Sequence, residues 1–414
     1  MGKNVYKIFI ILFSLIVLSC EQDNIVNIPA FSGGGKLAGS QSILPNQIQR
    51  LNGIYTVIEG ADQLGKKVVI KGTGNTLSVF TGKNAGLIVF HCGRIDSTLI
   101  FEGYWRYTQG SETGLAQFEI PAEHNGISLL QGINPTTAFQ FHGKIGEGSS
   151  EPVTQITLQF DRPIKDTTFG ILAHRGGGRN SDRLAESENS LGIIQLAESF
   201  GATGIEIDVR LTKDGIPILF HDENFSPRLV NGEYCVGPVS NFTFAAIRSL
   251  CTLKNGEPIP TLKEAMDVVL TKTSLSIVWL DIKSPEAISP AAALQQEYKA
   301  KAAAAGRTLD IYLGLATDEL VAEYKKKNLS SSADALCELS VNEVRNINAK
   351  VWAPRWTLGP LPNESEQMRS EGRKTFVWTL DQREFMLPFF TSGKIDAILT
   401  NYPALVAFEY YVFQ

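Results

Sequence analysis

Residues 204–222 read GIEIDVRLTKDGIPILFHD, and this stretch decides the fold of the second half of the chain. Glu206 and Asp208 alternate with isoleucine and valine, which is the two-residue period of a β-strand, so both carboxylates lie on one face. The apolar residues between them predict packing against helices on the other face. A turn with the sequence KDG follows, and a second short extended segment ends at His221. The stretch therefore predicts a helix-covered strand whose other face carries two acidic groups.

Strand-like and helical segments alternate from residue 166 to the end of the chain, which is typical of a parallel sheet covered by helices. Eight such units in roughly 250 residues match the size of a (β/α)₈ TIM barrel. We therefore predict an α/β TIM-barrel domain over residues 166–414. The eight strand candidates are residues 169–175, 204–210, 276–282, 310–316, 334–340, 349–355, 374–380 and 396–402.

The preceding residues 44–163 contain short alternating runs separated by glycine, asparagine and proline. This pattern predicts an all-β domain, either a sandwich or a lipocalin-like barrel. Tyr104, Trp105 and Tyr107 are candidates to line a ligand surface, but packing in the core is the favoured interpretation. The sequence leaves the role of this domain open.

The first twenty residues, MGKNVYKIFIILFSLIVLSC, combine two lysines with an apolar run that is too short for a comfortable membrane span of about 20 residues. Residues 1–20 are therefore predicted to be a signal peptide. Their end resembles the lipobox of bacterial lipoproteins, which are cut before an acylated cysteine; a plain secretory signal is the alternative. We expect an exported protein that is anchored to a membrane by lipid on Cys20, with residues 21–43 as a flexible tether.

The composition is that of a globular protein, with 43% hydrophobic and 20% charged residues. A net charge of −5 provides no basic field for DNA or RNA, so we expect a small molecule or a lipid headgroup as the substrate. The cysteines beyond Cys20 match no zinc-site spacing. A disulfide between Cys235 and Cys251 is one of several open pairings for an exported protein. These cysteines are Cys92, Cys235, Cys251 and Cys337.

Catalytic groups of TIM barrels lie at the C-terminal ends of the strands, and several of the predicted strands end in polar residues. Glu206 and Asp208 would point into the barrel, where two carboxylates repel each other and are costly to bury unless a cation lies between them. Carboxylate oxygens suit Ca²⁺ or Mg²⁺ better than zinc. The sequence thus predicts a divalent cation as cofactor. The other strand-end candidates are His174, Arg175, His221, Asp281, Lys283 and Trp378.

His174 and His221 are the two histidines of the predicted TIM barrel, and both fall at its predicted active face. An imidazole titrates near neutrality, so two of them beside a divalent cation suit acid/base catalysis. Phosphodiester hydrolysis needs these parts, together with positive side chains on the phosphate oxygens.

The ordered set HRGG, ENS, GIEIDVRLTKDGIPILFHD, IPTLKEAM, WLDIK, FVWTLD and ILTNYP resembles the glycerophosphodiester phosphodiesterases, over residues 168 to 408. The resemblance implies a (β/α)₈ barrel that hydrolyses glycerophosphodiesters to glycerol 3-phosphate and an alcohol, with Ca²⁺ or Mg²⁺. It implies acid/base roles for the two histidines and metal ligation by Glu206, Asp208 and Asp281. It further places Arg175 and Lys283 on the phosphate, Glu188 in a site-ordering position and Trp378 near the glycerol; core packing is the alternative for Trp378.

Two departures from the family pattern bear on the site. The third metal ligand is normally glutamate, and aspartate at position 281 is one methylene shorter, so the cation is expected to shift or to bind more weakly. The proline that normally precedes Glu188 is missing, and the polar loop before it is the part least like the family. Both departures concern substrate preference and metal affinity.

Two alternatives to the leading interpretation remain. Related barrels suggest a phospholipase D-like or phosphoinositide-cleaving enzyme acting on lipids. A non-catalytic ligand-binding lipoprotein is the alternative from another functional class, although retention of both histidines and three acidic candidates argues against it. The sequence does not indicate an oligomeric state.

Overall fold

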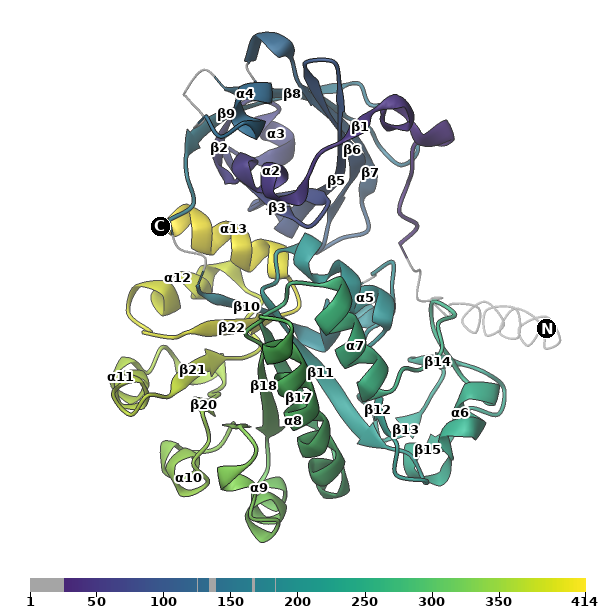
Figure 1. Ribbon diagram of the computed structural model, residues 1–414, viewed down its shortest axis with the longest axis vertical. Helices are drawn as coiled ribbons and strands as arrows, with labels where there is room; N and C mark the ends of the chain where they lie inside the picture. Colours follow the sequence, from purple (N-terminus) through teal and green to yellow (C-terminus); the bar gives the residue numbers. More distant parts are fainter. Residues whose placement is uncertain (1–25, 125, 134–138, 166–167, 183) are drawn as a thin grey trace, which may run out of the picture.

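The computed structural model describes residues 26–124, 126–133, 139–165, 168–182 and 184–414. They form two barrels, one above the other in Figure 1: an antiparallel N-terminal barrel and a parallel C-terminal barrel. The predicted signal peptide and Cys20 lie outside the described residues. Within the described part of the chain, no helix has the length and apolar character needed to cross a membrane.

The N-terminal barrel is a closed antiparallel sheet in which each strand pairs with the next and β9 pairs back with β2. The predicted all-β domain is thus one closed sheet and not a two-sheet sandwich. Closure pairs the backbone of the outermost strands, which would otherwise be exposed edges. Its strands are β2 (Gly53–Glu59), β3 (Lys67–Thr73), β4 (Thr76–Thr81), β5 (Gly86–Ile95), β6 (Thr98–Tyr107), β7 (Thr113–Ile120), β8 (Gln140–Ile145) and β9 (Thr154–Arg162).

Aromatic side chains fill the interior of this barrel. Tyr55, Phe90, Phe101, Phe118 and Phe141 are almost fully buried, and their rings contact one another at angled geometries. Offset and edge-to-face contacts are the favourable arrangements of aromatic pairs. The barrel therefore has a packed core along its axis.

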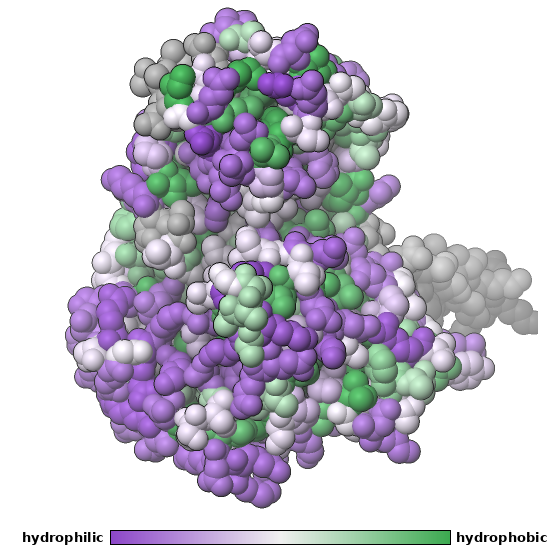
Figure 2. All heavy atoms as spheres, viewed as in Figure 1, coloured by the Kyte–Doolittle hydropathy of each residue, from purple (hydrophilic) through white to green (hydrophobic). Residues whose placement is uncertain are grey.

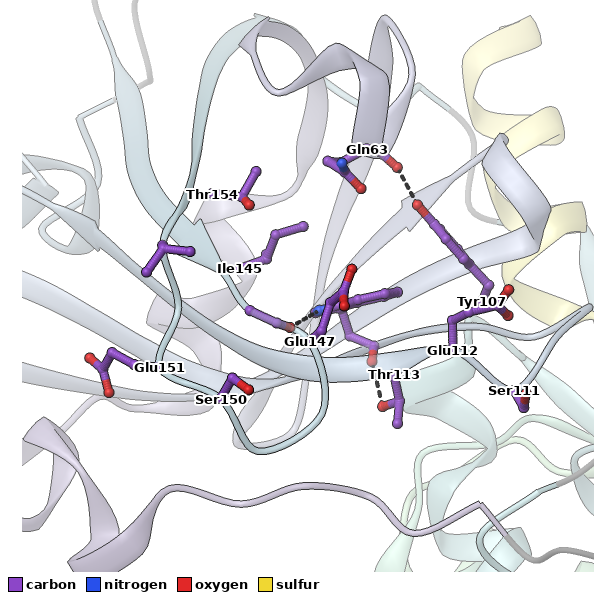
Figure 3. A pocket seen from close by; sticks show the side chains of 13 residues that line it. Gln63, Tyr107, Ser111, Glu112, Thr113, Ile145, Glu147, Ser150, Glu151 and Thr154 are labelled. Atoms are coloured by element: carbon purple, nitrogen blue, oxygen red, sulfur yellow. Dashed lines mark hydrogen bonds between the residues drawn. The ribbon is translucent and has the colours of Figure 1, made fainter.

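One end of the N-terminal barrel opens into a cavity of about 700 Å³, which is shown in Figure 3. Trp105 and Tyr107 belong to the buried core and also form one wall of this cavity, so core packing and cavity lining coincide there. Tyr104, on the opposite face of β6, packs against the apolar cluster that the two barrels share. The cavity lies between α3 (Ala61–Leu64) and the loops that follow β6 and β8.

Residues 26–43 pack against the N-terminal barrel, which differs from the flexible tether expected there. β1 (Gln41–Ser42) extends the sheet next to β5. The backbone N–H groups of Lys36 and Leu37 donate to the buried Glu102 carboxylate at 3.1 and 3.0 Å. The glycine run gives turns instead of a flexible chain, because Gly33, Gly34 and Gly35 adopt positive φ angles and fold the segment back.

The C-terminal barrel has eight parallel strands closed by pairing of β10 with β22 and β11, which confirms the predicted (β/α)₈ fold. Helices surround it in Figure 1. The strands are β10 (Gly170–Ala173), β11 (Gly204–Leu211), β17 (Ile277–Ile282), β18 (Asp310–Leu315), β19 (Ala335–Cys337), β20 (Val351–Trp352), β21 (Lys374–Val377) and β22 (Ala397–Thr400). The helices that follow them are α5 (Leu191–Leu196), α7 (Leu262–Lys272), α8 (Ile288–Ala304), α9 (Asp318–Lys326), α10 (Val341–Asn346), α11 (Pro362–Ser370), α12 (Arg383–Thr391) and α13 (Pro403–Phe413).

The second unit of this barrel carries an insertion between β11 and α7. Its first strand, β12 (Pro217–Leu219), runs back antiparallel to β11, as the turn KDG indicated. The remainder has a small apolar core of its own and the disulfide Cys235–Cys251, which resolves the open pairing. Cys92 and Cys337 are free. The insertion contains β13 (Asn224–Phe225), β14 (Val230–Asn231), β15 (Gly237–Pro238), α6 (Phe244–Leu250) and β16 (Thr252–Leu253).

The C-terminal helix α13 lies between the two barrels and is buried on several faces (Figure 1). A helix that is apolar around most of its circumference needs partners on both sides. Phe408 shares one apolar cluster with Phe80 and Leu87 of the N-terminal barrel. Lys71 of β3 donates to the Tyr411 hydroxyl at 3.2 Å. Hydrophilic side chains cover most of the helix-bearing C-terminal lobe in Figure 2.

Candidate active site

A cleft of about 560 Å³ opens at the C-terminal ends of the parallel strands. It brings together residues from most of the barrel; of the nine residues predicted for the site, seven line the cleft. Glu188 and Asp208 lie beneath the cleft surface, and both are buried. The predicted residues that line the cleft are His174, Arg175, Glu206, His221, Asp281, Lys283 and Trp378.

Three carboxylates form the floor of the cleft. Glu206 and Asp208 project from β11, and the parallel register of β11 and β17 places Asp281 opposite Asp208. One oxygen from each of the three lies within 4.8 Å of the others. Lys283 Nζ lies 2.8 Å from Asp208 Oδ1 and 2.5 Å from Asp281 Oδ2, so it neutralises part of the cluster. The structure thus brings together the three carboxylates that were predicted as metal ligands, two from β11 and one from β17.

The charged neighbours shift the pKa values of Glu206 and Asp208 in opposite directions. Burial, followed by the negative charges of Asp208 and Asp281, raises the pKa of Glu206 well above its usual range. Burial alone would raise the pKa of Asp208 too, but the positive charges around it, led by Lys283, lower that pKa to about 2. The cluster therefore holds more negative charge than its protein neighbours stabilise.

The donor set fits a hard divalent cation. Glu206 Oε1 is buried and makes no hydrogen bond within the described part of the chain. A buried carboxylate oxygen without a partner is costly, and a cation bound among the three carboxylates would supply one. All three ligands are oxygens, which Ca²⁺ and Mg²⁺ prefer. The three carboxylates are therefore arranged so that they could hold a metal ion.

His174 ends the first strand and is fixed by a chain of hydrogen bonds. The Asn401 amide donates to Asp381 Oδ2 at 2.6 Å, which turns its oxygen toward His174 Nδ1 at 2.7 Å. Nδ1 must then carry the proton, because an amide oxygen only accepts. Nε2 is left with its lone pair, 3.7 Å from Glu206 Oε2. Burial and the charge of Arg175 lower the pKa of His174 to about 4, so the ring is neutral at pH 7.

His221 reaches the cleft from the insertion. β12 returns along β11, and the Arg210 guanidinium donates to the His221 carbonyl oxygen at 3.0 Å. His221 Nδ1 lies 2.7 Å from Asp222 Oδ1, and Asp222 also forms an ion pair with Arg228. Since Asp222 engages Nδ1, the remaining nitrogen, Nε2, is free to act on a ligand in the cleft.

Hydrogen bonds to the buried carboxylates of Glu206 and Glu188 fix Arg175 and the loop that follows it. Arg175 adopts a positive φ of 52°, and its backbone N–H donates to Glu206 Oε2 at 2.8 Å. Its Nη1 donates to Glu188 Oε1 at 2.7 Å. The other Glu188 oxygen accepts from the backbone N–H of Asn180 at 2.8 Å, so Glu188 ties Arg175 to the polar loop. Asn189 is also at positive φ. Its side-chain NH₂ donates to Asp208 Oδ2, and its side-chain oxygen accepts from the Asp208 backbone N–H.

Trp378 lines the opposite wall of the cleft. Its indole N–H donates to the Ala353 carbonyl at 2.8 Å, and the Arg355 guanidinium lies 5.0 Å from its ring centroid. The ring is thus fixed in orientation while it still faces the cleft. Glu338, at the end of β19, adds another carboxyl group, whose pKa is raised to about 8 by burial and then by Asp281.

Several of these residues were missed from the sequence. Glu338 and Arg355 follow β19 and β20, and Asn401 follows β22, so the rule that catalytic groups follow barrel strands would have included them. Asn189 and Asp222 adjoin predicted site residues in the ENS and FHD motifs. Asp381 carried a weaker signal, because it acts through Asn401 and not on the cleft directly.

Comparison with known proteins adds an independent observation. Residues 174–405, more than half of the chain, match the Glycerophosphoryl diester phosphodiesterase family. A glycerophosphodiester phosphodiesterase of Caldanaerobacter subterraneus is 30% identical over 249 residues, which cover 56% of this chain and 94% of the relative. A probable glycerophosphodiester phosphodiesterase 2 of Mycobacterium tuberculosis is 27% identical over 245 residues, 56% of this chain and 86% of the relative. A crystal structure of a glycerophosphodiester phosphodiesterase from Parabacteroides distasonis aligns with a TM-score of 0.46 at 22% identity, over 58% of this chain and 95% of that one.

Proposed function

Because this chain belongs to the glycerophosphoryl diester phosphodiesterase family, we propose that its cleft releases glycerol 3-phosphate and an alcohol with two histidines and a carboxylate-bound Ca²⁺ or Mg²⁺. The chain is a hydrolase of glycerophosphodiesters, as are the relatives named for this activity. The observation that carries the finer proposal is the convergence of two differently held histidines on one three-carboxylate group. A non-catalytic binding protein would not be expected to maintain this arrangement.

His174 is proposed as the base. Its Nε2 is unprotonated at neutral pH, because Asn401 fixes the proton on Nδ1 and the pKa of the ring lies near 4. It can take the proton of the hydroxyl that attacks phosphorus. The Asn401–Asp381 pair holds the ring so that Nε2 is directed at the cleft before and after it takes the proton.

His221 is proposed as the acid. Asp222 lies against Nδ1 and would stabilise the positive charge of the protonated ring. Nε2 can then donate its proton to the leaving oxygen as the bond between phosphorus and that oxygen breaks. The alcohol leaves neutral, and the phosphate remains on glycerol.

Arg175 and Lys283 provide the positive side chains of the cleft. Glu188 holds Arg175 in one orientation, which favours binding of a phosphate oxygen without rearrangement. Lys283 bonds Asp208 and Asp281, so we propose that it is shared between these carboxylates and the substrate phosphate. A cation bound by Glu206, Asp208 and Asp281 would neutralise charge on the phosphate oxygens.

Trp378 is proposed to pack against the glycerol part of the substrate, since it faces the cleft with its N–H already bonded. The headgroup would then lie toward the polar loop that Glu188 ties down. We propose export and acylation at Cys20, which would place this cleft outside the cytoplasm at a membrane surface. Loss of fatty-acid labelling in Cys20→Ser would support the anchor, and unchanged labelling would contradict it.

The test is a substrate panel with the purified chain from residue 21 onward, assayed with Ca²⁺ and with Mg²⁺. Glycerophosphocholine, glycerophosphoethanolamine and glycerophosphoinositol should release glycerol 3-phosphate. In water enriched in ¹⁸O, the label should appear in the phosphate of glycerol 3-phosphate and not in the alcohol. Turnover of lysophospholipids without turnover of the deacylated substrates would indicate a phospholipase D-like enzyme instead.

A further inference from the structure

Arg106 is a buried cation of the N-terminal barrel that points at the catalytic barrel. It lies on β6 between Trp105 and Tyr107, whose side chains face the interior, so the Arg106 side chain leaves the barrel on its outer face. It is 3% exposed. Its Nη2 donates to the Asp182 carbonyl at 3.4 Å, and its Nε makes no hydrogen bond within the described residues.

The loop that Arg106 touches is the polar loop that follows His174 and Arg175. Asp182 is buried and organises this loop, because its carboxylate accepts hydrogen bonds from the Arg179 backbone and guanidinium at 2.9 to 3.0 Å. The same carboxylate accepts from the Tyr402 hydroxyl at 3.1 Å. The loop is therefore held at Asp182 by contacts from both barrels.

Tyr402 connects this contact to the reaction centre. It follows Asn401, the residue whose amide oxygen fixes the tautomer of His174. A narrow cavity between the barrels is lined by Arg106, Asp182, Asn401 and Tyr402 together. The side chain of one domain thus reaches the residues that hold the proposed base of the other.

Stability alone does not account for Arg106. A buried guanidinium with an unpaired Nε costs free energy, and an apolar side chain of similar size in such a position is often as stable or more stable. Burial also lowers the pKa of Arg106, which reflects the same cost. A contribution to the geometry of the catalytic loop would explain why a charged residue occupies this position.

We propose that the N-terminal barrel is a positioning domain for the catalytic loop, and that Arg106 is the positioning residue through which it acts on Asp182, Asn401 and His174. This inference rests on the proposed function of the cleft. Displacements of about 1 Å at a reacting group can cost on the order of 100-fold in rate, so a partial loosening of the loop is expected to cost about tenfold.

The experiment compares Arg106→Met, Arg106→Lys and Lys71→Met in the full chain after residue 20. Lys71 is the matched control, because it bonds Tyr411 across the same interface and has no hydrogen bond or ion pair to the described residues of the catalytic loop. Arg106→Met should lower kcat about tenfold while KM stays within about threefold and the melting temperature does not fall. Arg106→Lys keeps a positive charge beside Asp182 and should recover most of kcat; Lys71→Met should stay within twofold of wild type.

Two kinetic results would overturn the proposal: equal kcat in Arg106→Met and Lys71→Met, or a loss of kcat that only follows a loss of melting temperature. Hydrogen exchange of peptides that span the loop gives a readout that does not depend on activity. Exchange should be faster in Arg106→Met and unchanged in Lys71→Met, and unchanged exchange in both would overturn the proposal. If the wild-type chain releases no glycerol 3-phosphate, the proposed function fails and hydrogen exchange still decides the role of Arg106.

Discussion

The two barrels of this chain differ in where they bury carboxylates and in whether those carboxylates are hydrogen-bonded. The interior of the N-terminal barrel is filled by aromatic rings, and its buried Glu102 lies on the outside, where its carboxylate accepts backbone N–H bonds. The C-terminal barrel buries Glu206 and Asp208 in its interior, beside a third carboxylate and with one oxygen unpaired. The N-terminal barrel satisfies its buried carboxylate, whereas the C-terminal barrel leaves a buried carboxylate oxygen without a hydrogen bond among the described residues.

The difference follows from strand direction. An antiparallel barrel with nearest-neighbour strands alternates strand ends at each rim, so no single rim collects the ends of all strands. A parallel barrel brings eight strand ends to one rim, where side chains from different strands converge. The contrast therefore predicts that polar substitutions change activity in the C-terminal barrel and stability in the N-terminal barrel, with Arg106 as the exception because it contacts the catalytic loop.

The largest expected effect is the loss of either histidine in the cleft. His174→Asn and His221→Asn should each lower kcat by roughly 10² to 10⁴, the usual contribution of general acid/base catalysis. His142→Asn in the N-terminal barrel is the matched control and should retain kcat. Steady-state kinetics on a glycerophosphodiester measure kcat, and melting temperatures show whether each variant is folded. Full activity in either cleft variant would remove that histidine from the mechanism.

The insertion next to the cleft should depend on its disulfide. Its apolar core is small, and Cys235–Cys251 closes a loop with a sequence separation of 16. A loop of that size is stabilised by about 3 kcal/mol in the chain-entropy account, so the double substitution to alanine should lower the unfolding free energy of the insertion by about that much. Urea unfolding measures the loss. Reductant should destabilise the wild type and leave the double variant unchanged; equal sensitivity in both would contradict the assignment.

Substitution of the two buried glutamates, Glu102 and Glu206, by glutamine should change the stability of the metal-free protein in opposite directions. Glu102→Gln weakens charge-assisted hydrogen bonds and should cost about 1.5 to 3 kcal/mol of stability. Glu206→Gln removes a buried carboxyl group beside two others and should raise the melting temperature in chelator, because burial, followed by the charges of Asp208 and Asp281, already raises the pKa of Glu206. With Ca²⁺ or Mg²⁺ the order should reverse, since the wild type gains a ligand. Thermal melts with and without metal test both signs; destabilisation by Glu206→Gln in chelator would show that the cluster is not strained.

The smallest effect is expected at the mouth of the N-terminal barrel. Glu147 is exposed and lines the cavity in Figure 3, and it does not belong to the described residues that line the cleft. Glu147→Gln should leave kcat and KM within about twofold, as exposed substitutions away from special features do. A larger loss in kcat would mean that this cavity takes part in turnover and that the N-terminal barrel affects the cleft through more than Arg106.

The strands of the C-terminal barrel were predictable because short strand-like runs alternate with longer helical segments over residues 166–414. Glu206 and Asp208 could be placed in the interior, since the residues between them are aliphatic. The role of residues 26–43 was not predictable. Their glycine-rich composition is typical of a linker, and only the tertiary position of Glu102 shows why the segment packs.

The supporting residues of the site were harder to predict than the groups in the cleft. Asn401 and Asp381 act by fixing the tautomer of His174, and such contacts depend on side-chain orientation that no sequence period encodes. The contact of Arg106 with Asp182 joins positions 76 residues apart in different domains. Local pattern carries no signal for a pair of this kind.

The most direct test of the central claim is metal restoration of glycerol 3-phosphate release. Wild-type chain that has been treated with chelator and then desalted should be inactive toward a glycerophosphodiester, and Ca²⁺ or Mg²⁺ should restore its kcat. Glu206→Gln, prepared identically and folded, should show no restoration at the same metal concentrations. Full activity of the wild type in chelator, or equal restoration of Glu206→Gln, would contradict a carboxylate-bound cation in this cleft.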